Sequence, residues 1–80
     1  MRTEQVRQLV EKYTLKELMV AEKQIKEGKF ISIEIQGETR GDMLTHVLAA
    51  SYVKEKMSNE QKDFNTILRV YASRVRVTLC

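Results

Sequence analysis

Residues 42–57, DMLTHVLAASYVKEKM, place apolar side chains around most of a helix instead of along a single stripe. The apolar members of the stretch are Met43, Leu44, Val47, Leu48, Ala49, Ala50, Tyr52, Val53 and Met57. A helix that is apolar on several sides is one that other elements contact on several sides. The stretch therefore predicts a central helix from Met43 to about Met57, with Asp42 as its N-cap.

A further helix is expected directly after this central one. Ser58 stands three residues before Gln61, which is the spacing of a capping box. The residues beyond it form one apolar stripe that runs to about Val77: Phe64, Ile67, Leu68, Tyr71, Ala72 and Val75. Because only two or three residues link the two helices, they are expected to form an antiparallel hairpin.

Two helices are predicted before the central one. One apolar face is formed by Val6, Leu9, Val10 and Tyr13, and a second, differently oriented face by Leu15, Leu18, Met19 and Ile25. Thr14 and Glu17 have capping-box spacing between these faces, and Gly28 suits the position after a helix end. We expect helices at 3–13 and 15–27, with a continuous helix through Tyr13 and Thr14 as the alternative.

Residues 29–36, KFISIEIQ, give the clearest strand pattern in the chain. Ile31, Ile33 and Ile35 alternate with polar residues between two glycines. No second strand is evident, so three pairings stay open: a strap that packs on the helices, pairing with the same strand of another copy, or weaker pairing with residues 75–79. The fold class is mainly α: one domain, residues 1–80, of about four short amphipathic helices and one short strand or extended segment.

Composition narrows the class of protein. Hydrophobic residues make up 42% and charged residues 31%, which is typical of a soluble globular domain. No apolar run is long enough to span a membrane, and the first residues do not resemble a secretory signal. One cysteine and one histidine are too few for an internal disulfide or a zinc cage. We therefore expect a cytoplasmic protein without a metal or cofactor.

The net charge of +3 is only mildly uneven along the chain. Residues 1–38 hold seven Lys and Arg against seven Glu, whereas residues 39–80 hold seven Lys and Arg against four Asp and Glu. Nucleic-acid binders usually carry a denser basic patch. The charge pattern is thus more typical of a solvated surface than of a nucleic-acid interface.

No residue pattern points to catalysis. His46 follows Asp42 by four residues, but nothing completes a metal set, which favours a partly buried structural histidine. Cys80 at the chain end has no neighbouring base, and residues 37–41, GETRG, are typical of a turn more than of a phosphate cradle. No catalytic, cofactor-binding or metal-binding residue is assigned, and the protein is not expected to be an enzyme.

The order of elements in residues 29–77 resembles the ribbon–helix–helix family, whose members dimerise by pairing one strand from each subunit. The resemblance implies that alternate ribbon residues enter the major groove of DNA, and here these are Phe30, Ser32, Glu34 and Gln36. The chain departs from the family because its strand is not N-terminal and because Glu34 would face DNA phosphates. The expected nucleic-acid contacts in this alternative are Lys62, Arg69 and Arg76, although their spacing also suits a solvated helix face.

The favoured interpretation is a non-catalytic helical protein that acts through protein–protein interaction as a homodimer. A domain this small has a marginal core and often gains stability by self-association. The expected self-association residues are Ile31, Ile33, Ile35, Met43 and Val53. Nucleic acid and membranes are not favoured as partners, and the sequence does not identify a protein partner.

Three strings of the chain resemble those of small uncharacterised bacterial proteins: KYTLKEL at 12–18, IEIQGE at 33–38 and GDMLTHVLAA at 41–50. The resemblance implies a bacterial origin and no particular activity.

Overall fold

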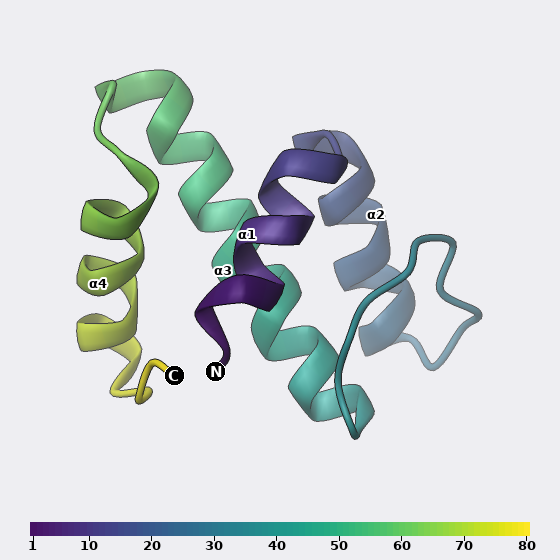
Figure 1. Cartoon of the computed structure of the whole chain (residues 1–80). Coiled ribbons are helices and arrows are strands. Elements are labelled where there is room, and N and C mark those ends of the chain that lie inside the picture. The colour runs from purple at the N-terminus through teal and green to yellow at the C-terminus, as the bar shows by residue number, and fades with distance from the viewer.

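The computed structural model describes residues 1–80 and contains four helices (Figure 1). They are α1 (Thr3–Lys12), α2 (Leu15–Lys26), α3 (Arg40–Glu60) and α4 (Phe64–Val75). The helix α3 is the longest, and α1, α2 and α4 each pack against it. The mainly helical fold predicted from the sequence is confirmed, and α3 is its central helix.

The core forms where the other three helices meet α3. Its residues are almost entirely apolar, and its fully buried members include Val6, Leu18, Ala21, Val47, Ala49, Ala50 and Val53. Ala49 and Ala50 lie side by side on α3 with no exposed surface. Small side chains at these positions leave room for neighbouring helices to approach α3 closely.

The predicted break between α1 and α2 is confirmed. The Thr14 hydroxyl accepts the Glu17 backbone N–H at 3.2 Å, while the Glu17 carboxylate accepts the Thr14 N–H at 2.9 Å. This reciprocal capping box starts α2 and leaves Tyr13 extended, so a continuous helix is excluded. Gly28 follows the end of α2 with a φ of 70°, a conformation that glycine adopts readily.

The predicted start of α3 is wrong by one turn. The N-cap is Thr39, whose hydroxyl accepts the Asp42 N–H at 3.1 Å, and Asp42 lies inside the first turn. An acidic residue in the first turn complements the helix dipole whether or not it is the cap. Because aspartate is favourable at both positions, the sequence did not show whether Asp42 is the N-cap or lies in the first turn.

The predicted boundary between the last two helices is also wrong. Ser58 lies within α3, which continues to Glu60 and ends at Gln61, a residue with a left-handed φ of 53°. The N-cap of α4 is Asp63, whose carboxylate accepts the Thr66 N–H at 2.7 Å. Ser58 has helical backbone in the last turn of α3, whereas an N-cap residue stands outside its helix in extended conformation, so Ser58 cannot cap α4.

Residues 28–39 form a loop between α2 and α3, which we call the isoleucine loop, and no strand is present in the chain. Ile35 is buried, and Ile31 and Ile33 are half-buried against the core. The alternation of the isoleucines therefore orients side chains as expected, but the predicted strand is not observed. A strand needs a partner strand, and this chain offers none beside the loop.

The two ends of the chain pair with each other. The Thr3 N–H donates to the Cys80 carbonyl at 3.1 Å, and the Cys80 N–H donates to the Met1 carbonyl at 3.0 Å. Figure 1 shows both termini at the same end of the molecule, between α4 and α3. The C-terminal segment thus bonds to the N-terminal residues, and the weaker alternative, in which residues 75–79 pair with residues 29–36, is not observed.

Candidate interaction surface

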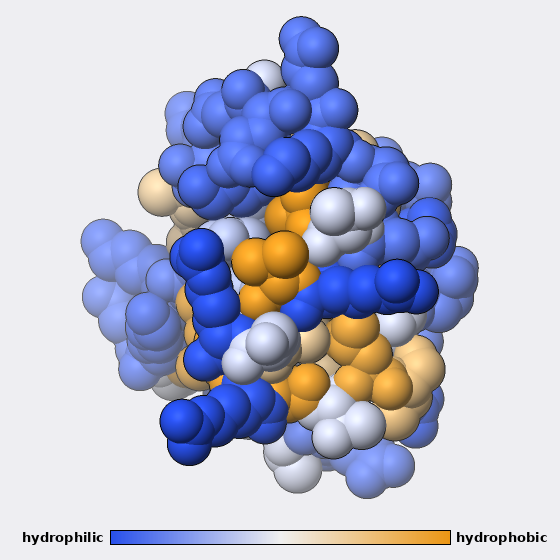
Figure 2. Space-filling view, turned by 90° about the vertical axis from the view of Figure 1, so that its left-hand side faces the viewer, coloured by the Kyte–Doolittle hydropathy of each residue, from blue (hydrophilic) through white to orange (hydrophobic).

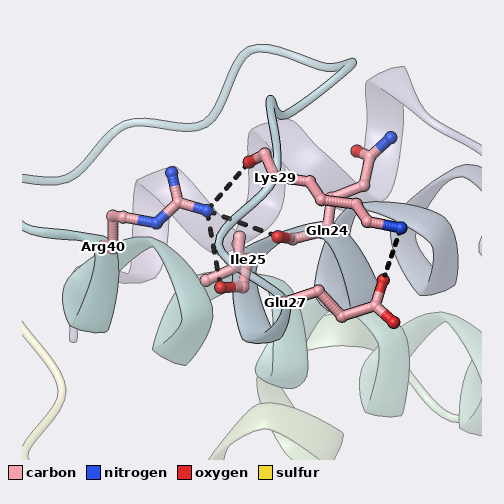
Figure 3. Close-up of polar contacts among 5 residues, drawn as sticks. All are labelled: Gln24, Ile25, Glu27, Lys29 and Arg40. Carbon is pink, nitrogen blue, oxygen red and sulfur yellow. Dashed lines mark hydrogen bonds and ion pairs between the residues drawn. The ribbon is translucent and has the colours of Figure 1, made fainter.

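The isoleucine loop is closed at its base by one arginine. The Arg40 guanidinium donates to the carbonyl oxygens of Lys29, Gln24 and Ile25 at 3.0, 3.3 and 3.4 Å (Figure 3). Two of these carbonyls belong to the last turn of α2, where helix geometry leaves them without intrahelical partners. A positive charge at that position also complements the helix dipole. Arg40 therefore caps α2 and ties the two ends of the loop together, as in a compact Ω-loop.

Side chains of α2, of α3 and of Tyr13, which lies between α1 and α2, form hydrogen bonds with the loop backbone. Gln24 accepts the Ser32 N–H at 2.9 Å, and the Tyr13 hydroxyl accepts the Glu34 N–H at 3.2 Å. Further along, His46 Nδ1 lies 2.9 Å from the Gln36 carbonyl oxygen. No residue from 30 to 38 makes a backbone–backbone hydrogen bond. The extended part of the loop is thus positioned by side chains where a β-sheet would use a neighbouring strand.

The other side of this extended backbone has no partner. Residues 34–37 run without a bend, and in extended chain the polar groups of successive residues point to opposite edges. Glu34 and Gln36 face the chain's own side chains, whereas the N–H and C=O of Ile35 form no hydrogen bond. The same holds for the N–H and C=O of Ile33. The N–H and C=O groups of Ile33 and Ile35 are therefore without a hydrogen-bond partner within the chain.

An exposed aromatic ring lies at the start of the same loop. Phe30 is 89% exposed, and the next most exposed large apolar residue, Met19 on α2, is 58% exposed. Single exposed apolar residues are common on protein surfaces. Phe30, however, belongs to the same loop as the unpaired backbone groups of Ile33 and Ile35. The loop therefore combines an exposed apolar side chain with unsatisfied hydrogen-bonding groups.

The end of the loop is pressed against the start of α3. A Cβ atom added to Gly37 would lie 2.9 Å from Met43 Cγ and 3.0 Å from the Met43 backbone nitrogen. Both distances are shorter than ordinary Cβ contacts, so any other residue at position 37 would force Met43 to shift. Met43 is half-buried beneath the loop and belongs to the layer that packs against the core.

The residues expected to mediate self-association are divided between surface and core. Ile31, Ile33 and Met43 are half-buried, whereas Ile35 is 7% exposed and Val53 is fully buried. Val53 faces the chain's own core, so it offers no surface to a second copy in this structure. The sequence placed Phe30 on the surface only within the ribbon–helix–helix alternative, and it did not reveal Arg40 as the residue that closes the loop.

His46 is the one buried polar residue of the core. Its Nδ1 donates to the Gln36 carbonyl, and its Nε2 accepts the Arg2 backbone N–H at 3.3 Å. Because Gln36 offers an acceptor and Arg2 a donor, the proton must lie on Nδ1. The ring joins the N-terminal residues and the isoleucine loop to α3.

A polar cavity of about 580 Å³ opens between the termini, the isoleucine loop and the start of α3. Its lining includes Arg2, Glu38, Asp42, His46 and Cys80. No hydrogen bond joins Cys80 to His46, and both ring nitrogens of His46 are engaged by backbone groups. No group of three His, Cys, Asp or Glu residues is arranged to hold a metal ion.

No single helix is both long enough and apolar enough to cross a membrane.

The three residues of the nucleic-acid alternative do not form a stripe along one helix. Lys62 precedes α4 and lies 3.5 Å from the Glu60 carboxylate. Arg69 is on α4, and Arg76 follows the helix with a left-handed φ of 57°. The predicted helical stripe is wrong because α4 is shorter at both ends than the apolar pattern indicated.

The family model described as a family of unknown function (DUF6952) matches residues 1–79. The resemblance to uncharacterised proteins found in the sequence is thus confirmed by a match over nearly the whole chain. No curated protein matches the chain, and no solved structure does.

Proposed function

We propose that this chain, which belongs to the DUF6952 family of unknown function, acts without catalysis through protein–protein interaction and associates with a second copy of itself. The interface in this proposal is the isoleucine loop. The observation that carries it is that the N–H and C=O groups of Ile33 and Ile35 have no partner, whereas Glu34 and Gln36 between and after them are bonded to side chains.

An unpaired extended edge is a natural site for adding a strand from another chain. In this mode of recognition the backbone hydrogen bonds supply affinity, while side chains on alternate residues supply specificity. The isoleucines of this loop already pack on their own core, so a partner strand meets a supported edge. Phe30, at the start of the loop, supplies the apolar contact beside that edge.

A second copy is the partner favoured by symmetry and by size. Two identical segments can pair antiparallel about a two-fold axis, so that the backbone N–H and C=O groups of each segment bond to those of the other. Only 16 of the 80 residues are buried in the isolated chain, and it contains no disulfide. Small domains without such cross-links commonly gain stability from association. A bacterial cytoplasmic setting, in which the lone cysteine stays reduced, belongs to the same proposal.

The ribbon–helix–helix alternative has less support. It requires Glu34 to face DNA and places Lys62, Arg69 and Arg76 on one helical face. Lys62 is already close to the Glu60 carboxylate, and Arg69 is the one residue of the three that lies within α4. Nucleic-acid binding through this ribbon therefore remains the second choice.

Sedimentation equilibrium across a concentration series tests the self-association. We expect the wild type to dimerise and Phe30→Asp to shift the equilibrium toward monomer, because an added carboxylate would lie beside the interface. Met19→Asp is the matched control, because Met19 is also an exposed apolar residue but belongs to α2 and not to the loop. Both variants should keep the helical circular dichroism spectrum of the wild type. A wild-type chain that stays monomeric at millimolar concentration would contradict the proposal.

Hydrogen exchange gives a second test that needs no substitution. The amide of Ile35 has no partner in the isolated chain, whereas that of Glu34 is bonded to Tyr13. We expect protection of the Ile35 amide to rise with protein concentration and that of Glu34 to change little. Equal, concentration-independent exchange at both amides in a dimeric sample would show that the dimer uses another surface.

A further inference from the structure

The charge excess of the chain lies entirely in its last 17 residues. Residues 1–63 hold eleven Lys and Arg against eleven Asp and Glu, and so are neutral overall. Residues 64–80 contain Arg69, Arg74 and Arg76 and no acidic side chain, which accounts for the whole net charge of +3. This segment is α4 and the residues that follow it.

None of these three arginines forms an ion pair within the chain. The five ion pairs of the structure use Arg7, Lys26, Lys29, Lys56 and Lys62. Arg69, Arg74 and Arg76 are exposed and make no hydrogen bond through their side chains. The positive charge of α4 is therefore available to a group outside the chain.

The exposed side of α4 combines this charge with apolar surface. The buried residues of the helix, among them Ile67 and Leu68, face α3, whereas Val70 is 44% exposed. Val70 lies one turn before Arg74 on the same face, and Arg69 and Ser73 lie beside it. In Figure 2, which views α4 from outside the molecule, apolar residues occupy the middle of the face and strongly hydrophilic residues extend across both sides.

Two tyrosines extend this surface on the side of α4 that carries Arg74. The rings of Tyr52 and Tyr71 lie 4.9 Å apart, and both residues are half-buried. Burial, and to a smaller extent the nearby Glu22 carboxylate, raises the pKa of Tyr71 above its ordinary value of 10.0. A tyrosine hydroxyl is protonated at neutral pH and can donate a hydrogen bond. No hydrogen bond engages either hydroxyl. Tyrosine and arginine are the residue types that most often dominate the binding energy of protein interfaces.

From these observations we infer that the exposed face of α4, formed by Arg69, Val70, Ser73 and Arg74 and extended by Tyr71 and Arg76, docks an acidic amphipathic segment of another protein. The partner's apolar side chain contacts Val70, and its carboxylates reach the arginines on either side. This face lies on the opposite side of the molecule from the isoleucine loop (Figure 1), so it can be occupied while that loop is paired.

The surroundings of the face favour an acidic peptide over a nucleic acid. The other nearby cations, Lys56 and Lys62, both pair with Glu60, so the positive charge does not extend as a track along the surface. Lys56 also lies over the Tyr52 ring, 5.7 Å from its centroid, and Tyr71 lies against that ring. Tyr52 is therefore not free for a base to stack on it, as single-stranded nucleic acids require.

Titration with a helical peptide of leucine and glutamate, followed by amide chemical shifts of the full chain, tests the inference. We expect shifts confined to residues 66–76 and to Tyr52, and affinity that decreases as salt is added. Replacing the arginines together, as Arg69→Gln, Arg74→Gln and Arg76→Gln, should weaken binding about tenfold. None of the three makes a contact on which folding depends, so the variant should keep the wild-type melting temperature.

Two comparisons make the outcome decisive. The control variant Lys12→Gln, Lys16→Gln and Lys23→Gln removes three other exposed cations and should leave peptide affinity unchanged. Equal weakening in both variants would mean that only net charge matters, and the inference would be overturned. It would also be overturned if single-stranded or duplex oligonucleotides bind this face more tightly than the peptide, or if the peptide shifts residues of the isoleucine loop instead.

Discussion

The side-chain ammonium group of Lys54 donates a hydrogen bond of 2.7 Å to the carbonyl oxygen of Val10. Val10 lies in the last turn of α1, where the final carbonyls have no partner within the helix. Arg40 does the same for the last turn of α2. The central helix α3 thus supplies a cation to the C-terminal end of each of the two helices that precede it.

Replacing Lys54 should reveal the energy of this contact. Lys54→Met keeps the apolar stem but leaves the Val10 carbonyl, which is partly buried, without its charged donor. We expect a loss of about 1–3 kcal/mol in the free energy of unfolding, measured by urea denaturation. Lys56→Met is the control, because Lys56 pairs with Glu60 at an exposed position and should contribute little.

The closure of the isoleucine loop depends on Arg40. Arg40→Met removes the three bonds at the base of the loop, and we expect a loss of about 1–2 kcal/mol in the free energy of unfolding. Amide exchange at Ser32 should accelerate more than exchange in α4. Arg40→Lys should restore part of the loss, since lysine keeps the charge but lacks the forked donor. Unchanged exchange at Ser32 in Arg40→Met would show that the loop holds its shape without this contact.

Two glycines at the start of α3 should respond in opposite ways to alanine. Gly37→Ala places a Cβ atom 3.0 Å from the Met43 backbone nitrogen and should cost about 1–3 kcal/mol of stability. At Gly41 the nearest atom to an added Cβ is the Thr39 hydroxyl at 3.6 Å, an ordinary contact. Gly41→Ala should therefore stabilise the chain by up to about 1 kcal/mol, because alanine favours a helix. Thermal unfolding of both variants provides the comparison.

The cap of α4 should make stability sensitive to acid. Hydrogen bonds from the Thr66 side chain and from its backbone N–H, the latter at 2.7 Å, hold the pKa of Asp63 below its ordinary value of 3.8. A carboxyl group whose pKa is lower in the folded chain stabilises the fold fully above that ordinary value. The contribution disappears as pH falls below 3.8 through the lowered pKa.

Asp63→Asn tests this acid sensitivity, because asparagine also caps helices but does not titrate. We expect the variant to lose less stability than the wild type between pH 5 and pH 2, measured by urea denaturation at each pH. Parallel losses in the two proteins would show that other carboxyl groups, and not Asp63, set the acid response.

The candidate surface was only partly visible in the sequence. The alternation of Ile31, Ile33 and Ile35 indicated which side chains turn toward the core, because that pattern depends on neighbouring residues alone. It did not reveal that Gln24, Tyr13 and His46 bond one edge of the loop. Those contacts join residues 8–21 positions apart, and they exist only once the helices have packed.

What the sequence by itself determined was local. The capping box of Thr14 and Glu17, the left-handed Gly28 and the apolar residues around α3 each follow from side chains within a few positions of one another. The tertiary structure alone decided where α3 ends, which cations reach the carbonyls of α1 and α2, and that residues 29–36 remain unpaired. The physical reason is that a helix satisfies its own backbone, whereas a strand, a distant cap or an exposed charge is defined by what lies beside it.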